Sequence, residues 1–144
     1  MKKNGIINRG LLKGIGEIGH TDMIFICDAG FPIPKDSLCI DLSIVKGFPT
    51  IDVVLEALLG EVVVEEYFVH DLMKKVNLEC YEYVKSCLDR QEGNEVAFGI
   101  LKEKANQAKM MIRTGDIRPC SNLVLVAASG VPEMVRKYEL DRRK

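Results

Sequence analysis

The chain has 144 residues, of which 47% are hydrophobic and 28% charged, and its formal net charge is −1 at pH 7. This length favours a single domain, and a chain of this size buries roughly 70% of its unfolded surface, so it needs neither a disulfide nor a metal to fold. The near-neutral charge argues against nucleic-acid binding. No apolar run approaches the ~20 residues needed to cross a bilayer, so we expect no membrane contact.

The five cysteines, at positions 27, 39, 80, 87 and 120, form no C-x-x-C pair. Their spacing fits neither a zinc site nor a disulfide framework, so we expect reduced thiols and no bound metal. The N-terminal stretch is broken by polar and charged residues and does not resemble a signal peptide. These features together predict a cytoplasmic protein.

The first half of the chain predicts a helix, two strands and a second helix. Hydrophobic residues recur at helical spacing over residues 6–18, although three glycines weaken that helix. Residues 23–27 form an all-apolar run, which predicts a central strand, and residues 40–44 predict a short second strand. Thr50 is a good N-cap for a helix that continues to Leu59.

The second half also alternates strands and helices. Residues 61–69 have the valine-rich and aromatic composition of a strand, and residues 71–90 predict an amphipathic helix interrupted near Asn77. The remaining predictions are strands over 94–98, 109–113 and 122–128 and a helix over 102–107. This alternation favours an α/β fold whose largely parallel sheet is covered on both faces.

Residues 14–19 match the letters of the dinucleotide-binding fingerprint G-x-G-x-x-G. That fingerprint requires a strand before the glycines and a helix that opens through them. Here the glycines lie inside or after a helix-like segment, and the predicted strand follows them. We therefore expect no nucleotide cofactor.

The predicted strand over residues 23–27 is flanked by polar residues of catalytic type. His20 precedes it, and histidine is scarce in this chain, which has only two. His20 is either a proton shuttle or a structural residue that hydrogen bonds to the backbone, and Asp22 either orients its imidazole or caps the turn. Asp28 follows the strand and is either a turn residue or a ligand for sugar hydroxyls, since ligands gather at the carboxyl ends of strands in open α/β sheets.

Two further residues have a structural interpretation that we favour over a functional one. His70 precedes Asp71, which we expect to be a helix N-cap. Cys120 lies beside Pro119 in a predicted loop, and the sequence offers no base to activate its thiol. We therefore expect Cys120 to line a pocket rather than to act as a nucleophile.

Two blocks of sequence resemble the D-ribose pyranase family, which also includes the L-fucose mutarotases. The first block is Gly19-His20-Thr21-Asp22 with Asp28-Ala29-Gly30-Phe31-Pro32-Ile33-Pro34, Ile40-Asp41-Leu42 and Gly47-Phe48-Pro49, and the second is Ile112-Arg113-Thr114-Gly115-Asp116 with Asn122. The resemblance spans residues 1–131 and predicts a pyranase-like domain there. Residues 132–144 would form a C-terminal extension whose apolar spacing is compatible with a helix.

This resemblance implies a single-domain three-layer α/β/α sandwich with a largely parallel or mixed central sheet. It also implies a homo-oligomeric ring, a decamer or octamer, with active sites at the contacts between subunits. Members of the family interconvert cyclic forms of an aldose without metal or nucleotide. Two alternatives are a mutarotase for L-fucose or another sugar, and a non-catalytic sugar-binding or regulatory protein on the same scaffold.

The resemblance assigns roles to five positions. His20 matches the catalytic histidine, a general acid and base, and Asp28 and Asn122 match residues that bind the sugar. Cys120 stands where the family usually has a tyrosine, and Phe98 stands near the position of an expected pocket histidine. Each lost hydrogen bond costs on the order of 1 kcal/mol, so we expect weaker ribose binding or a shift toward another sugar, with D-ribose the leading substrate.

Overall fold

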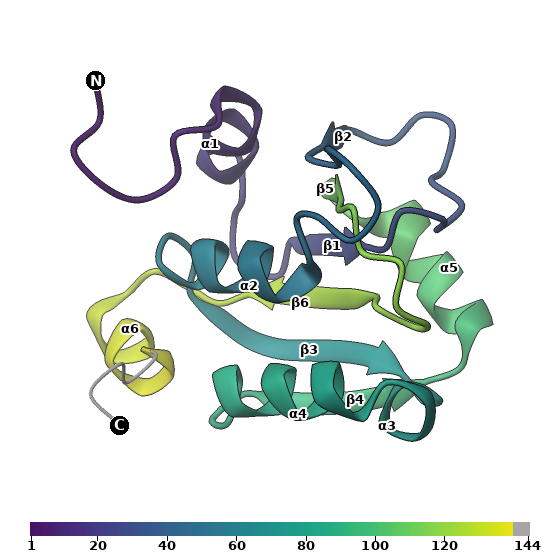
Figure 1. The fold of residues 1–144 in the computed structure, drawn as a ribbon. Helices are drawn as coiled ribbons and strands as arrows, with labels where there is room; N and C mark the ends of the chain where they lie inside the picture. Colours follow the sequence, from purple (N-terminus) through teal and green to yellow (C-terminus); the bar gives the residue numbers. More distant parts are fainter. Residues whose placement is uncertain (140–144) are drawn as a thin grey trace.

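The computed structural model describes residues 1–139, which contain one six-stranded sheet in the order β2-β5-β1-β6-β3-β4 (Figure 1). The strands are β1 (Met23–Cys27), β2 (Cys39–Asp41), β3 (Val64–His70), β4 (Glu92–Val96), β5 (Met110–Arg113) and β6 (Leu123–Ala127). β6 runs antiparallel to both of its neighbours, β1 and β3, and the other neighbouring strands pair in parallel. The sheet is therefore mixed, within the range that the sequence predicted.

Because of this topology, the ends of β1 to β5 and the beginning of β6 lie along one edge of the sheet, here called the carboxyl edge. Ligands of open α/β proteins usually bind at such an edge. The beginning of β1 and the end of β6 lie at the opposite edge.

Helices cover both faces of the sheet. They are α1 (Arg9–Gly16), α2 (Ile51–Leu59), α3 (Met73–Val76), α4 (Leu78–Cys87), α5 (Phe98–Gln107) and α6 (Pro132–Tyr138). Figure 1 shows α2 and α4 on one side of the sheet and α5 on the other. The three-layer α/β/α prediction is thus confirmed.

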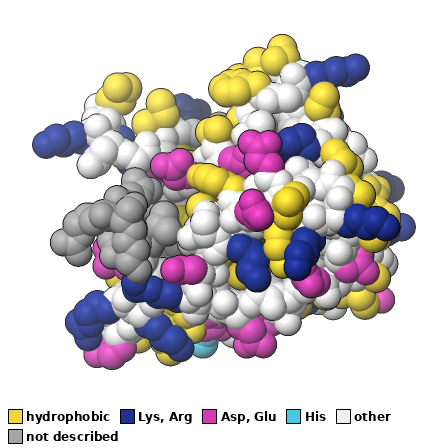
Figure 2. All heavy atoms as spheres, turned by 60° about the horizontal axis from the view of Figure 1, so that its bottom comes forward, with side chains coloured by type: hydrophobic (Ala, Val, Ile, Leu, Met, Phe, Trp, Pro, Cys, Tyr) yellow, Lys and Arg dark blue, Asp and Glu magenta, His cyan; other side chains and the backbone are white. Residues whose placement is uncertain are grey.

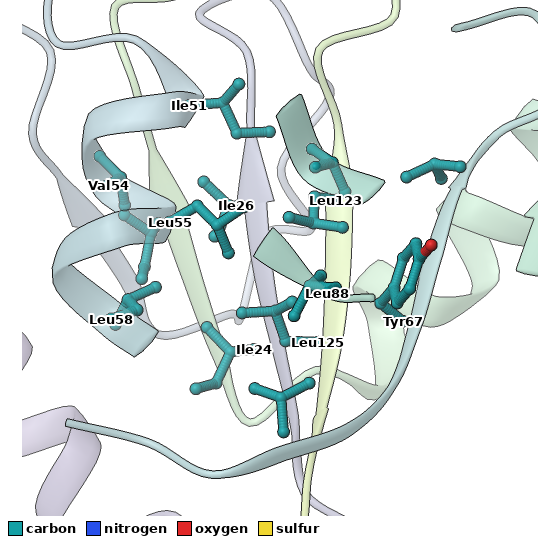
Figure 3. Close-up of a cluster of buried hydrophobic side chains, with 14 of the residues drawn as sticks. Ile24, Ile26, Ile51, Val54, Leu55, Leu58, Tyr67, Leu88, Leu123 and Leu125 are labelled. Atoms are coloured by element: carbon teal, nitrogen blue, oxygen red, sulfur yellow. The ribbon is translucent and has the colours of Figure 1, made fainter. Parts of the chain in front are cut away.

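The larger hydrophobic cluster lies between the sheet and α1, α2 and α4. In Figure 3, Leu55 and Leu58 of α2 face Ile24 and Ile26 of β1. The smaller cluster covers the other face, where Leu101 of α5 packs with alternate residues of the central strands. Strand residues point to opposite faces in turn, so an unbroken apolar run such as β1 supplies both clusters.

Several local predictions are confirmed and others are corrected. The strand over 23–27 has the predicted bounds, and Asn77 separates α3 from α4. Gly14 and Gly16 lie in α1, which precedes a strand, so the fingerprint letters lack the context of a dinucleotide site. Phe98 was predicted at the end of a strand, but it begins α5, because the helical spacing of Leu101 and Ala105 anchors that segment against the sheet.

Two helix starts differ from the predicted capping. Thr50 occupies the N-cap position of α2 without a side-chain hydrogen bond, and the carboxylate of Asp116 accepts from the Ile51 amide at 3.1 Å instead. The N-cap of α3 is Leu72 rather than Asp71, so that prediction is wrong. For α2, a contact from outside the helix thus replaces the expected local cap.

The predicted C-terminal extension begins with α6, and its residues 140–144 lie outside the described part of the chain. None of the helices within residues 1–139 has the length and apolar character needed to span a membrane. Figure 2 views the molecule from the side of α3 and α4, where positive and negative side chains lie interspersed. That mixture accords with the net charge of −1.

Candidate functional site

Asp28 and Asn122 form a reciprocal pair at the carboxyl edge. Asp28 follows β1, and Asn122 precedes β6. The Asn122 Oδ1 accepts from the Asp28 amide at 3.0 Å, and the Asn122 Nδ2 donates to the Asp28 Oδ2 at 3.0 Å. Burial raises the pKa of Asp28, although hydrogen bonds from Asn122 and Gly30 oppose that effect. Two residues far apart in sequence are thereby held as one polar unit.

The loop after β1 is held in place by Arg113 and Thr114. The Arg113 guanidinium donates to the carbonyl of Ala29 through Nη2 at 2.9 Å and to the carboxylate of Asp41 through Nη1 at 2.9 Å. The Thr114 hydroxyl donates to the carbonyl of Cys27 at 2.8 Å. These residues belong to the second sequence block of the resemblance, so that block positions Asp28. No role was predicted for them from the sequence.

Behind this loop lies a buried ion pair. The side chain of Asp116 is 1% exposed, and its Oδ2 lies 2.7 Å from Nη2 of Arg118. Burial opposes ionisation of Asp116, but hydrogen bonds from Arg118 and the Ile51 amide outweigh it and hold the pKa of this carboxyl below its usual value. Asp52, at 3.0 Å, is a second partner of Arg118. The pair therefore joins the carboxyl edge to the start of α2.

Cys120 lies two residues before Asn122 in a strained loop conformation, with φ of +58°. Asn77 fixes this loop by donating to the Ser121 hydroxyl at 3.0 Å and to the Pro119 carbonyl at 3.2 Å. Burial raises the pKa of the Cys120 thiol, and the negative charges of Asp28 and Asp71 raise it further. The thiol is therefore protonated at neutral pH, which disfavours a nucleophilic role.

Aromatic rings line the α5 side of the carboxyl edge. Phe98 is 42% exposed, and its ring stacks with that of His70 at a centroid distance of 6.0 Å and an interplanar angle of 26°. Phe31 contacts Phe98 edge-on at 5.8 Å. The sequence favours a structural interpretation of His70. One sequence signal points instead to a site residue, because His70, like Asp28, directly follows a predicted strand.

His20 lies at the opposite edge of the sheet. The neighbouring Thr21 amide donates to the carbonyl of Ala127, the last residue of β6. The His20 side chain is 52% exposed, and its Nε2 lies 3.2 Å from Oε2 of Glu65 and 3.3 Å from Oε1. Asp22 caps the turn by accepting from the Gly19 amide at 2.8 Å, so Glu65 is the acidic partner of the imidazole.

The structure thus gathers four of the five predicted site residues, Asp28, Asn122, Cys120 and Phe98, at one edge and places His20 at the other. β1 has five residues and rises about 3.3 Å per residue, so its length alone separates the two edges by about 15 Å. One chain therefore does not bring His20 to the Asp28–Asn122 pair.

The side chains of residues 1–139 include no group of three His, Cys, Asp or Glu arranged to hold a metal ion. All five cysteines are free thiols. Burial raises the pKa of Cys27 and of Cys80 to about 12, which keeps both neutral.

Comparison with known proteins places this geometry in context. Residues 1–131 match the model of the RbsD / FucU transport protein family. A D-ribose pyranase of Geobacillus thermodenitrificans is 42% identical over 87% of this chain and 95% of its own length. The structure of Bacillus subtilis RbsD complexed with D-ribose superposes with a TM-score of 0.88 and 35% identity, covering 91% of this chain and 100% of that one. The fucose mutarotase of Streptococcus pneumoniae, in complex with L-fucose, shares the fold at 18% identity, with a TM-score of 0.74 over 87% of this chain and 95% of that one.

Proposed function

Because the chain belongs to the RbsD / FucU transport protein family, we propose that it is an aldose pyranase or mutarotase that interconverts the cyclic forms of a sugar, with D-ribose as the leading substrate. Ring-form interconversion is the activity that the sequence predicted, and it is the activity in the name of the D-ribose pyranase relatives. The observation that carries the proposal is the reciprocal Asp28–Asn122 pair at the carboxyl edge.

The chemistry requires few groups. Opening a cyclic hemiacetal removes the proton of the anomeric hydroxyl and adds a proton to the ring oxygen, and the aldehyde then recloses on another hydroxyl or another face. In the proposed mechanism His20 moves these protons, as general acid and base, and Asp28 and Asn122 hold the hydroxyls. General acid–base catalysis contributes roughly 10²–10⁴-fold, which is sufficient because sugar opening already proceeds slowly in water.

We also propose that each site contains groups from two subunits of a homo-oligomeric ring. His20 and Asp28 lie at the two ends of β1, about 15 Å or more apart, which exceeds the length of a monosaccharide. The exposed imidazole of one subunit would meet the carboxyl edge of its neighbour. A decamer or octamer is the assembly implied by the family resemblance.

Exchange NMR of D-ribose, D-galactose and L-fucose, with and without the protein, tests the proposed activity. We expect faster exchange between pyranose and furanose or anomeric signals, and the sugar accelerated most identifies the substrate. The His20→Ala variant should lose about 10²–10⁴-fold in this rate while sugar binding is kept. Sugar binding by the unaltered protein without any acceleration would instead support the non-catalytic alternative.

Complementation tests the shared site. His20→Ala and Asp28→Asn should each be inactive alone, and after dissociation and mixed reassembly about one quarter of the sites would receive both intact groups if subunits pair at random. The control is the same treatment of each variant by itself. Mixed oligomers, verified by native mass spectrometry, that show no regained activity would contradict a site shared between subunits.

One observation favours a second candidate substrate. The exposed ring of Phe98 and the neutral thiol of Cys120 make the site less polar than a phenol and an imidazole would. A deoxy sugar such as L-fucose has a methyl group that could pack against such a surface. Preferential acceleration of L-fucose in the NMR panel would establish this alternative.

The free thiols support a reducing compartment, and we propose a cytoplasmic location.

A further inference from the structure

His70 lies directly beside the Asp28–Asn122 pair. In the antiparallel pairing of β3 with β6, Phe68 faces Val124 and Val69 faces Leu123. One further step in this register places His70 opposite Asn122, where cross-strand Cβ atoms are roughly 5 Å apart.

The two side chains also share a face of the sheet. Phe68 and Val124 belong to the cluster under α5, and side chains two residues apart along a strand point the same way. His70 and Asn122 therefore both point toward α5. The stacking of His70 on Phe98, the first residue of α5, agrees with this placement.

The His70 imidazole is fixed by its contacts. Its Nδ1 accepts from the Leu72 amide at 3.0 Å and lies 2.9 Å from Oδ1 of Asp71. An amide can only donate, so in the tautomer that accepts from Leu72 the imidazole proton is on Nε2; the Asp71 carboxylate makes a close contact with Nδ1 but no hydrogen bond. The side chain is 11% exposed, and stacking on Phe98 sets the plane of the imidazole.

Nε2 is the part of His70 that the fold leaves free. Within the described part of the chain, residues 1–139, no hydrogen-bond partner contacts it, and it is not among the fully enclosed side-chain atoms, so solvent reaches it. A donor in this position is free to bond to water or to a ligand that displaces the water. Here that donor lies next to the pair proposed to hold sugar hydroxyls.

We propose that the Nε2–H of His70 donates a hydrogen bond to an oxygen of the bound sugar, so that His70 is a binding and specificity-determining residue of this site. The inference rests on the proposed function, because it assigns a further contact to the same sugar site. Asp28 and Asn122 would hold one side of the sugar, and His70 with the exposed ring of Phe98 would contact it from the α5 side.

Two substitutions separate the roles of the two ring nitrogens. In His70→Gln the side-chain amide nitrogen can take the place of Nε2, and the acceptor for Leu72 is lost. In His70→Asn the side-chain oxygen can take the place of Nδ1 and still accept from the Leu72 amide, and the Nε2 donor is lost. We expect about tenfold weaker binding of D-ribose, or of the preferred sugar, in His70→Asn, and affinity close to that of the unaltered protein in His70→Gln.

Sugar affinity is measured by titration calorimetry or ligand-observed NMR, and thermal unfolding is followed for both variants. Weaker binding in His70→Gln but not in His70→Asn would overturn the proposal, since it would mean that only the Leu72 contact matters. Unchanged affinity in both, or an equal loss in both with a lowered melting temperature, would overturn it as well. Failure of the proposed function shows differently, as sugar binding by the unaltered protein without accelerated exchange.

Discussion

The two edges of the sheet differ in how firmly their polar side chains are held. At the carboxyl edge, Asn122 is 3% exposed and shares two hydrogen bonds with Asp28, and Arg113 holds the adjoining loop. At the opposite edge, the His20 side chain is 52% exposed and has Glu65 as its partner at 3.2 Å. Groups that recognise a ligand must be fixed in advance, because ordering them at the moment of binding costs affinity.

A group that serves a neighbouring subunit has a different requirement. It has to reach beyond its own surface, so it cannot be buried in the chain that carries it. The proposed mechanism accounts for this difference, because in it the carboxyl edge binds the sugar and the exposed imidazole of another subunit moves the protons. Each of the following substitutions changes a group at one of the two edges and so tests this difference.

The largest effect is expected from Asp116→Asn, which removes the charge behind the carboxyl edge. Asp116 is buried against Arg118, and losing its charged hydrogen bonds costs about 1.5–3 kcal/mol in the free energy of unfolding, since Asp52 remains as a partner of Arg118. Because the pKa of Asp116 is lowered in the fold, its contribution is complete above its ordinary value of 3.8 and is lost as the pH falls through the lowered value. Denaturant unfolding at pH 7 and at pH 3 measures both the loss and its pH dependence.

The control for that experiment is Asp52→Asn, which removes the other partner of Arg118. Asp52 is 26% exposed, and its Oδ1 is buried without a hydrogen-bond partner among the described residues. Replacing it should therefore cost much less than replacing Asp116. Equal costs for the two variants would mean that the rigidity of the carboxyl edge does not depend on the Asp116 ion pair.

Much of the carboxyl edge was predictable from the sequence. The apolar run at 23–27 predicts a buried strand by local pattern alone, and it places Asp28 at the end of that strand; a ligand-binding role for Asp28 stays a prediction. The break at Asn77 follows from an interrupted helical series. Both features depend on residues close together in the chain, so the sequence pattern is enough to predict them.

The direction of β6 was not predictable, because an apolar run reads the same in parallel and antiparallel pairing. That direction brings Asn122 to Asp28 and His70 to Asn122, so the structural interpretation of His70 rested on local signals alone. The separation of His20 from the site follows from the length of β1, but its partner Glu65 comes from another strand and had no local signal.

A smaller effect is expected from Cys120→Tyr, which adds a phenol to the carboxyl edge. The backbone at Cys120 already has positive φ, so the substitution introduces no new backbone strain of that kind. One added hydrogen bond to the sugar should tighten ribose binding by about tenfold, as measured by calorimetry. The matched variant Cys120→Phe adds the aromatic ring without the hydroxyl, and an equal gain there would attribute the effect to packing. No gain in either variant would contradict the proposed role of position 120.

The smallest effect is expected from Glu65→Gln, which keeps the shape of the His20 partner and removes its charge. Partly exposed pairs of this kind are worth about 0.2–1 kcal/mol, so the exchange rate at saturating sugar should fall by a factor of about 1.5 to 5, with sugar affinity unchanged. Glu66→Gln is the matched control, because Glu66 accepts from Asn94 at 3.0 Å on the adjacent position of β3. A loss of sugar affinity in Glu65→Gln would place this carboxylate among the binding groups and remove the contrast between the two edges. A slower rate confined to Glu65→Gln would instead assign the carboxylate to the orientation of His20.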